Sequence, residues 1–270
     1  MAMDTEKKFK VTILGSGSSP GVPVIGCPCR VCKSQNPRNQ RTRSSLLLEF
    51  VSRGRHYRIV FDTSPDFRAQ MLRAKVTYLD AVIYTHTHSD HLHGFDDLRA
   101  FYFRSLQPVP CYIHATHAQE LRSRFSYAFR RDAYHGTKPQ VVLYEFGESA
   151  FTIGGQRFSP ALAHHGDMQT AVFRVGAFAY ATDFKALSEQ VRRAWRGKIH
   201  TMVASGHKWG EHPTHSTIEE TLDLFRDLKV KRGIVTHLGH EVDFVKDQRK
   251  MPRGMALAYD GMRLVVPHSV

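Results

Sequence analysis

The chain has 270 residues, of which 41% are hydrophobic and 23% are charged. A chain of this length and composition can bury a large core, which excludes a disordered or fibrous protein. No run approaches 18 apolar residues, and the first ten residues are charged and lack an apolar stretch. We therefore expect no membrane span, no secretory signal and a cytoplasmic location.

The balance of charge is unusual. The formal net charge is +13, and 17 residues are histidine. A basic balance is typical of proteins that bind nucleic acid, a membrane surface or a small anion, but dispersed lysines and arginines also make an ordinary solvated surface. Because imidazole is the commonest metal ligand in proteins, the histidines point more directly to a metal site.

Apolar periodicity predicts many short strands and a few helices. Strands are expected at 9–14, 45–51, 57–62, 80–84, 109–113, 141–146, 151–153, 157–163, 171–175, 177–182 and 232–236. A closing hairpin is expected over 255–266, turning at Asp260–Gly261. Helices are expected from Pro65 to Leu72 and from Phe95 to Arg104. Two further helices are expected to begin at capping boxes: one at Thr116 and Gln119, reaching Phe129, and one at Ser216 and Glu219, reaching Phe225. This order fits two sheets flanked by helices.

Several predicted strands end at a histidine or an aspartate. The positions are Asp62, His86, His165, Asp183 and His237. Loops that follow strands are where proteins display catalytic groups on a rigid scaffold. These strand ends are therefore the expected location of a functional site.

The segment 85–91 carries the strongest local motif, with His86, His88, Asp90 and His91 in close succession. In an extended segment His86 and His88 point to the same side, so both can reach one metal ion. Asp90 and His91 are too close to share that ion without strain but are suitably placed for a neighbouring one. Neutral imidazoles and a carboxylate suit zinc, manganese or iron, and the carboxylate favours a hydrolytic site.

Three of the four cysteines lie close together as Cys27, Cys29 and Cys32. In a reducing cytoplasm such a cluster indicates a metal site rather than disulfides. The fourth, Cys111, lies in the apolar run 109–113, where a core position is expected.

The motif His-x-His-x-Asp-His after a short apolar strand resembles that of the metallo-β-lactamase superfamily. The resemblance implies an α+β fold, a four-layer αβ/βα sandwich built as one domain over residues 1–270, with two divalent metal ions at one edge. It implies one ion on His86, His88 and His165, a second on Asp90, His91 and His237, and Asp183 between the two. His164 is the alternative to His165, although the His165–Gly166 pair favours the latter.

Asp62 resembles an earlier aspartate of the same superfamily. Its implied role is to orient a metal ligand or the loop of the metal site. The alternative, a residue that only shapes the turn at a strand end, fits the sequence equally well.

The segment 21–32 is similar to the N-terminal motif of the phosphoribosyl cyclic phosphate phosphodiesterases (PhnP-like) and their relatives. The similarity implies a structural zinc site in which Cys27, Cys29 and Cys32 of the loop at 26–32 are completed by His240, three residues after His237. A closed set of three thiolates and one imidazole suits zinc. A partly filled site or an iron–sulfur centre is the alternative.

A histidine before the last predicted helix also matches these phosphodiesterases. The resemblance implies that His215 contacts the substrate phosphate as a clamp or general acid, with His212 as a weaker alternative. The basic loop from Arg38 to Arg43 could line the anionic end of the pocket, or it is simply solvated.

The resemblance implies a phosphodiesterase with two active-site ions, zinc or manganese, and one structural zinc. Asp183, Asp90 and His215 are its expected catalytic residues. The expected substrate is a small cyclic ribose phosphate or a nucleotide-like diester, and a homodimer is the default expectation.

Three other functions stay open. One is an RNA-processing nuclease of the tRNA 3′-end maturation type, which the +13 charge favours, so nucleic acid is not excluded. Another is a non-catalytic accessory protein of cofactor biosynthesis, against which the complete ligand set argues. The third is a thioesterase, because a fold does not fix a function.

Overall fold

The computed structural model describes residues 8–130 and 137–270, and the charged segment at 1–7 lies outside them. Its first sheet has the strand order β15-β1-β2-β3-β4-β5-β6. In that order the strands are Arg263–Pro267, Lys8–Gly15, Ser45–Ser52, Arg55–Phe61, Ala81–Ile83, Val109–His114 and Val141–Phe146. The predicted hairpin of β2 and β3 is confirmed, with antiparallel pairing from Leu46–Phe61 to Ser52–Arg55.

The second sheet has the order β11-β8-β9-β10-β12-β13-β14, with β7 added beside β8. In that order the strands are Ala186–Leu187, Gln156–His165, Met168–Val175, Phe178–Ala181, Thr201–Ser205, Arg232–Thr236 and Met255–Leu257, and β7 is Phe151–Ile153. The strands β8, β10, β12 and β13 run in the same direction, because β8 and β10 are both antiparallel to β9 while β10, β12 and β13 are parallel. Their carboxyl ends therefore meet at one edge of the sheet.

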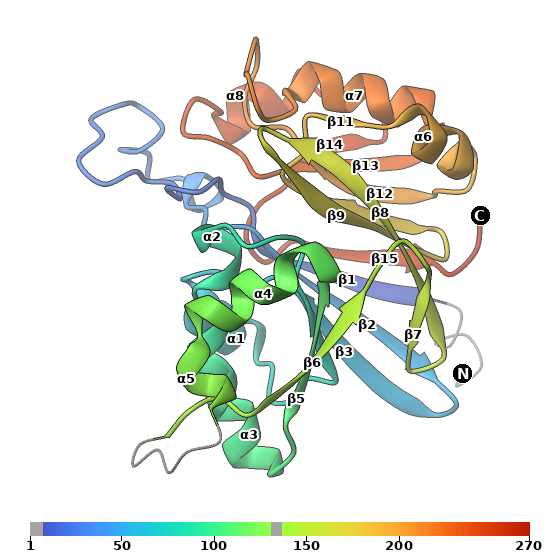
Figure 1. Cartoon of the computed structure of the whole chain (residues 1–270). Coiled ribbons are helices and arrows are strands. Elements are labelled where there is room, and N and C mark those ends of the chain that lie inside the picture. The colour runs from blue at the N-terminus through green and yellow to red at the C-terminus, as the bar shows by residue number, and fades with distance from the viewer. Residues whose placement is uncertain (1–7, 131–136) are drawn as a thin grey trace.

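Helices cover the outer face of each sheet, so the fold has four layers (Figure 1). Against the first sheet lie α1 (Phe67–Ala74), α2 (Ser89–Leu92), α3 (Arg99–Ser105), α4 (Ala115–Arg124) and α5 (Ser126–Phe129). Against the second lie α6 (Glu189–Trp195), α7 (Ile218–Asp227) and α8 (Phe244–Gln248). The predicted αβ/βα sandwich is confirmed for the described residues.

Three buried apolar clusters hold these layers together. Between the sheets, the Phe61 ring centroid lies 5.3 Å from that of Phe173 and 5.2 Å from that of Tyr180. A second cluster joins the second sheet to its helices through residues such as Phe225, and a third joins the first sheet to its helices through residues such as Phe67. Cys111 belongs to this third cluster and is fully buried, as expected. Burial of this kind is the main favourable contribution to folding.

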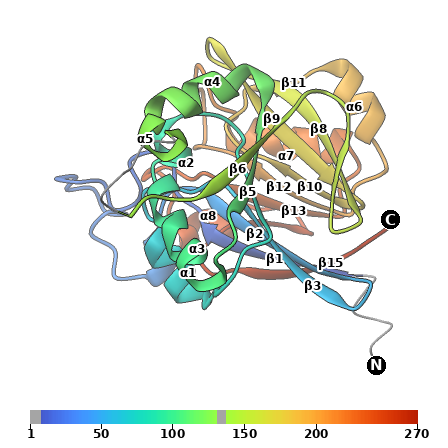
Figure 2. The same ribbon diagram turned by 60° about the horizontal axis from the view of Figure 1, so that its bottom comes forward.

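The predicted hairpin over 255–266 is wrong. Its two strands join different sheets: β14 pairs with β13, and β15 lies beside β1 (Figure 2). The connection is fixed by the carboxylate of Asp260, which accepts hydrogen bonds from Ser16 N at 2.9 Å, Ser16 Oγ at 2.8 Å, Thr42 N at 2.9 Å and Thr42 Oγ1 at 2.6 Å. An Asp-Gly turn between apolar runs favours a hairpin locally, but pairing with distant strands decides the outcome.

Two predicted helices begin at other residues. The first, α1, begins at Phe67 rather than Pro65, and the carboxylate of Asp66 bonds to Arg43 instead of capping the helix. The capping box of α7 consists of Thr217 and Glu220, one residue later than predicted.

The other two predicted helices are divided. A 3₁₀ turn over Phe95–Leu98 precedes α3. His114 rather than Thr116 is the N-cap of α4, which ends where Phe125 stacks on Phe95 at 4.5 Å, before the short α5. Cap positions shift by one or two residues because the cap side chains have competing partners.

We predict that Asp260→Ala lowers the free energy of unfolding by about 2–4 kcal/mol, because two amides and two hydroxyls lose a buried charged acceptor. Urea denaturation measures this change. Asp223→Ala is the control, because this 69% exposed carboxylate pairs with Arg226 at the surface and should change stability by less than about 0.5 kcal/mol. Equal effects of the two substitutions would show that Asp260 does not fix the connection between β14 and β15.

Candidate metal centre

The histidines and aspartates predicted at strand ends come together between the two sheets. His165 is the last residue of β8, and Asp183 and His237 follow β10 and β13. The carboxyl ends of these three strands share one edge. Asp62 and His86 follow β3 and β4, the parallel pair at the centre of the other sheet. The arrangement of the strands therefore brings distant parts of the sequence to one site.

The ligand atoms form two groups that share Asp183. In each group the atoms lie within 4.8 Å of one another: His86, His88, His165 and Asp183 in the first, and Asp90, His91, His237 and Asp183 in the second. Asp183 Oδ2 lies 2.7 Å from His91 Nε2 and 3.3 Å from His86 Nε2, while Oδ1 lies 2.9 Å from His237 Nε2. This is the grouping that the resemblance implied, with His165 rather than the exposed His164.

These donor atoms fit metal ions better than they fit one another. His86 Nε2, His91 Nε2, Asp90 Oδ2 and both Asp183 oxygens are buried, and none has a hydrogen-bond partner within residues 8–130 and 137–270. Buried polar atoms without partners are rare, because each costs about 1–3 kcal/mol. Convergence of such atoms indicates that a cation belongs between them.

The charges at the site lead to the same conclusion. Burial opposes ionisation of Asp183, but the charges of His237 and His91 outweigh it and hold the pKa of Asp183 well below its usual range. Burial likewise opposes a charge on His237, yet Asp183 and Asp90 raise its pKa to about 9. Asp183 thus stays ionised and requires positive charge nearby, from protons on imidazole or from divalent ions.

Asp62 orients two of the imidazoles. Its Oδ2 lies 2.8 Å from His91 Nδ1, and the same oxygen accepts a hydrogen bond from Thr85 Oγ1 at 2.8 Å. Because the Thr85 hydroxyl donates its only proton to Asp62, it accepts from His86 Nδ1, 2.9 Å away. Both histidines therefore carry their proton on Nδ1 and direct Nε2 toward Asp183, so Asp62 does more than shape a turn.

Three residues of the site adopt left-handed backbone conformations. Their φ angles are 62° at Asp62, 47° at Asp183 and 57° at His237. A non-glycine residue in this region costs of the order of 1 kcal/mol or more and persists where the surrounding structure requires it. The sequence gives no signal of this strain.

His215 lies beside both groups. Its Nδ1 is 3.5 Å from Asp183 Oδ1, and its ring centroid is 4.6 Å from that of His165 and 5.1 Å from that of His237. The side chain is 14% exposed, so a ligand can reach it. The structure thus places His215 at the rim of the site, while His212 lies one ring further out, 4.8 Å from His215.

Sequence reasoning missed His207. Its half-buried ring stacks on His215 with a centroid distance of 5.2 Å, and its Nδ1 has no hydrogen-bond partner among the described residues. Burial and the neighbouring His237 and His215 lower the pKa of His207 to about 3, so the ring is neutral. His207 follows β12 after Gly206, so the strand-end signal that marked the other residues was present here too.

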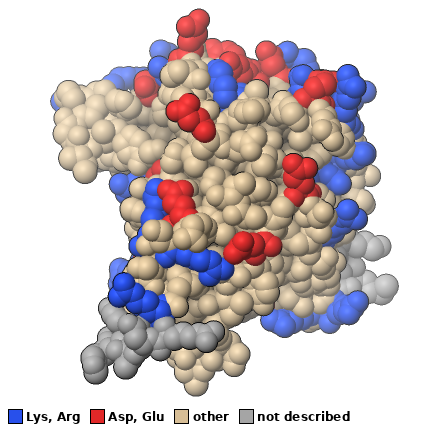
Figure 3. Space-filling model, in the orientation of Figure 1, with Lys and Arg blue, Asp and Glu red and all other residues tan. Residues whose placement is uncertain are grey.

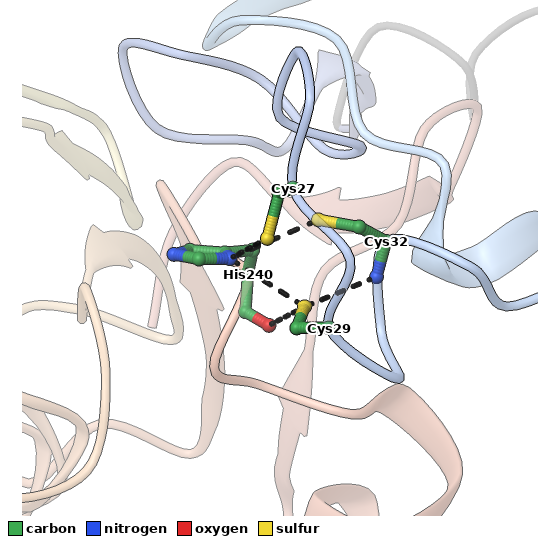
Figure 4. A group of neighbouring side chains, drawn as sticks. All are labelled: Cys27, Cys29, Cys32 and His240. Carbon is green, nitrogen blue, oxygen red and sulfur yellow. Dashed lines mark hydrogen bonds between the residues drawn. The ribbon is translucent and has the colours of Figure 1, made fainter.

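The cysteine cluster lies where the projecting loop between β1 and β2 meets the segment after β13 (Figure 4). The sulfurs of Cys27, Cys29 and Cys32 lie 3.3, 3.6 and 3.8 Å from His240 Nδ1. Tetrahedral zinc with ordinary bond lengths places sulfur and nitrogen ligands about 3.5 Å apart. The four side chains therefore fit the implied zinc site, and His240 is three residues from His237.

The arginines of the basic loop at 38–43 have contacts within the protein. Arg41 is buried and donates to Gly239 O at 3.2 Å and Val242 O at 2.8 Å. Arg43 pairs with Asp66 at 3.0 Å, and Arg38 lies over the rings of two aromatic side chains. These contacts favour a role in the packing of the loop over contact with an anionic substrate.

Comparison with known proteins shows which family the chain belongs to. Residues 57–238 match the beta-lactamase superfamily domain. The crystal structure of a diphosphatase from the PhnP family is 33% identical, with a TM-score of 0.88, and the alignment covers 97% of this chain and 99% of that one. The chain therefore belongs to the metallo-β-lactamase superfamily and, within it, to the PhnP family.

Two curated relatives are longer. An octanoyltransferase of Porphyromonas gingivalis is 33% identical over 261 residues, which cover 96% of this chain and 52% of that protein. A ribonuclease Z of Brevibacillus brevis is 31% identical over 107 residues, which cover 38% of this chain and 28% of that protein. The match covers about half the length of the first relative and a smaller share of the second.

We predict that Asp62→Asn lowers zinc affinity by about 10- to 100-fold, because an amide nitrogen facing His91 Nδ1 reverses the proton position of that ring. Competition with a chromophoric chelator measures the affinity. Asp167→Asn, at the exposed turn between β8 and β9, is the matched control and should leave affinity unchanged. Unaltered zinc affinity in Asp62→Asn would return Asp62 to the role of a turn residue.

Proposed function

We propose that the protein hydrolyses phosphodiesters with two divalent metal ions at this centre. The observation that carries the proposal is that Asp183 belongs to both groups of ligand atoms. A carboxylate shared in this way is typical of two-metal hydrolytic sites. Imidazole and carboxylate ligands suit zinc or manganese, and we propose a third, structural zinc at Cys27, Cys29, Cys32 and His240.

The residues of the chain supply binding and orientation. Bound ions at such a site provide Lewis acidity and make water nucleophilic at neutral pH. Asp62 and Thr85 keep His91 and His86 aimed at Asp183 throughout. His88, the exposed ligand of the first group, marks the side from which a substrate reaches the centre. We assign Asp90 to hold the second ion beside the attacked phosphorus.

His215 is the proposed proton donor. Its Nδ1 is buried, has no hydrogen-bond partner among the described residues, and lies 3.5 Å from Asp183 Oδ1. A phosphoryl group between the ligand groups would place its leaving oxygen within reach of this imidazole. Donation of a proton from Nδ1 to that oxygen completes the cleavage.

We propose a small substrate, such as a cyclic ribose phosphate or a nucleotide-like diester. The name of the 33% identical PhnP-family protein, a diphosphatase, supports cleavage of a P–O bond, and a phosphoanhydride is a close chemical relative of a phosphodiester. The three thiolates of the proposed zinc site suit a reducing compartment, so we also propose a cytoplasmic location. None of the helices in the described parts of the chain is long and apolar enough to span a membrane.

A ribonuclease is the second candidate, which the match to ribonuclease Z favours. On the face shown in Figure 3, lysines and arginines are interspersed with aspartates and glutamates rather than gathered in one stripe. A protein that binds RNA along its backbone needs a continuous basic track. This face offers no such track.

We predict that protein loaded with manganese or zinc hydrolyses bis(p-nitrophenyl) phosphate and that Asp183→Ala loses about 100-fold or more of kcat/KM together with bound metal. Release of p-nitrophenol and metal analysis measure the two losses. Asp167→Ala is the control and should resemble the wild type.

The same assay separates the alternatives. Metal-loaded protein that leaves the diester intact but cleaves an octanoyl thioester would overturn the phosphodiesterase proposal. Cleavage of a tRNA precursor but not of the small diester would overturn the proposal of a small substrate. Full activity and full metal content in Asp183→Ala would contradict the shared-carboxylate centre itself.

A further inference from the structure

The turn before α7 is held by one imidazole acting as an acceptor. His212 Nδ1 lies 3.1 Å from the backbone nitrogen of His215 and 3.3 Å from that of Thr214. Both backbone groups are N–H donors, so Nδ1 carries a lone pair and the ring proton is on Nε2. This is the arrangement in which asparagine and aspartate close short turns with their side-chain oxygen.

That turn carries two groups that the metal centre uses. The carbonyl oxygen of Thr214 lies 3.2 Å from His165 Nδ1, so it accepts the proton of that ring and leaves Nε2 for a metal ion. The next residue, His215, presents its Nδ1 to Asp183. A single acceptor atom therefore fixes both the orientation of a metal ligand and the position of the proposed proton donor.

The turn is also tied to the segment after Asp183. Lys185 Nζ donates to His212 O at 3.0 Å and pairs with Glu220 at 2.7 Å, and the Ser216 amide donates to Phe184 O at 2.7 Å. These bonds fix the two ends of the turn, whereas its middle depends on the imidazole of His212. Edge contacts with His207 at 4.7 Å and His215 at 4.8 Å limit how that ring can rotate.

The surroundings keep the ring neutral. Partial burial, His215 and the ammonium groups of Lys208 and Lys185 lower the pKa of His212. A neutral ring is what an acceptor at Nδ1 requires. The nearby Glu241 acts in the opposite direction but does not reverse this effect.

We propose that His212 is a positioning residue, whose Nδ1 holds the amides of Thr214 and His215 so that His165 and His215 face the metal centre. This role of His212 goes beyond the proposed function. Only the kinetic part of its test, which measures diester hydrolysis, rests on that function. The competing role, direct contact of His212 with the substrate through Nε2–H, makes a different prediction for asparagine at this position. The Asn oxygen can replace Nδ1 as the acceptor, but its side chain is too short to replace Nε2–H.

The experiment compares His212→Asn with His212→Leu in the zinc- or cobalt-loaded protein. Leucine has a similar size to asparagine but no acceptor. We expect H212N to stay within about threefold of the wild type, and H212L to lose about 10- to 100-fold in cobalt affinity and in kcat/KM. His164→Leu, which removes an exposed histidine next to His165, is the control and should change neither quantity.

A leaving-group series separates positioning of the proton donor from a general loss of structure. In H212L, kcat should fall further for a diester with an alkyl leaving group than for one with p-nitrophenolate, because only the former needs a proton from His215. Loss of stability alone would lower both rates equally. In a His215→Ala background, H212L should no longer alter this difference between leaving groups.

Two outcomes would overturn the proposal. Equal losses in H212N and H212L would assign His212 to substrate contact, and an unchanged H212L would deny it any role. If H212L does not fold, or if the wild type cleaves no diester, imidazole ¹⁵N spectra of the wild-type protein still test which nitrogen of His212 carries the proton. A protonated Nδ1 on His212, identified by its absence in H212N, would refute the inference without reference to the proposed function.

Discussion

The structure depends on one buried, ionised carboxylate. Asp183 is 1% exposed, and its two oxygens face imidazoles of both ligand groups. An isolated charge in such a place costs many kcal/mol, so the site is stable only with positive charge around the carboxylate. Divalent ions supply this positive charge, and each ion can be bound by several histidines at once. The convergence of so many histidines on Asp183 is therefore what a metal centre requires.

Much of the rest of the molecule serves to place groups around this carboxylate. Parallel strands of the second sheet bring His165, Asp183 and His237 to one edge, and β3 and β4 of the first sheet add Asp62 and His86. Asp260, in the connection between the two sheets, holds the loop after β1 against the loop that precedes β2. The cysteine cluster then ties that projecting loop to His240, and thus to the segment that carries a metal ligand (Figure 4). Packing, hydrogen bonds and the proposed structural zinc therefore act on the same few loops.

The sequence predicted the parts of this arrangement that have local signals. The segment 85–91 shows its chemistry in its spacing, and apolar runs revealed most strands because side chains alternate between the faces of a sheet. The partners of Asp183 came from resemblance, since nothing local links residues so far apart in the chain. The strands at 255–257 and 263–267 were misjudged because a turn signal says nothing about which distant strand each one joins. The hydrogen bond of the Thr214 carbonyl and the left-handed backbone of His237 could not be predicted, because neither depends on the type of the residue.

The most direct test of a two-metal centre at Asp183 is anomalous X-ray diffraction from crystals of the purified protein, with data collected on both sides of the zinc and manganese absorption edges. We expect two anomalous peaks that both contact Asp183, and a third, from zinc, among Cys27, Cys29, Cys32 and His240. Water or a direct imidazole–carboxylate hydrogen bond in place of the two peaks, in crystals of protein that is active on diesters, would contradict the central claim.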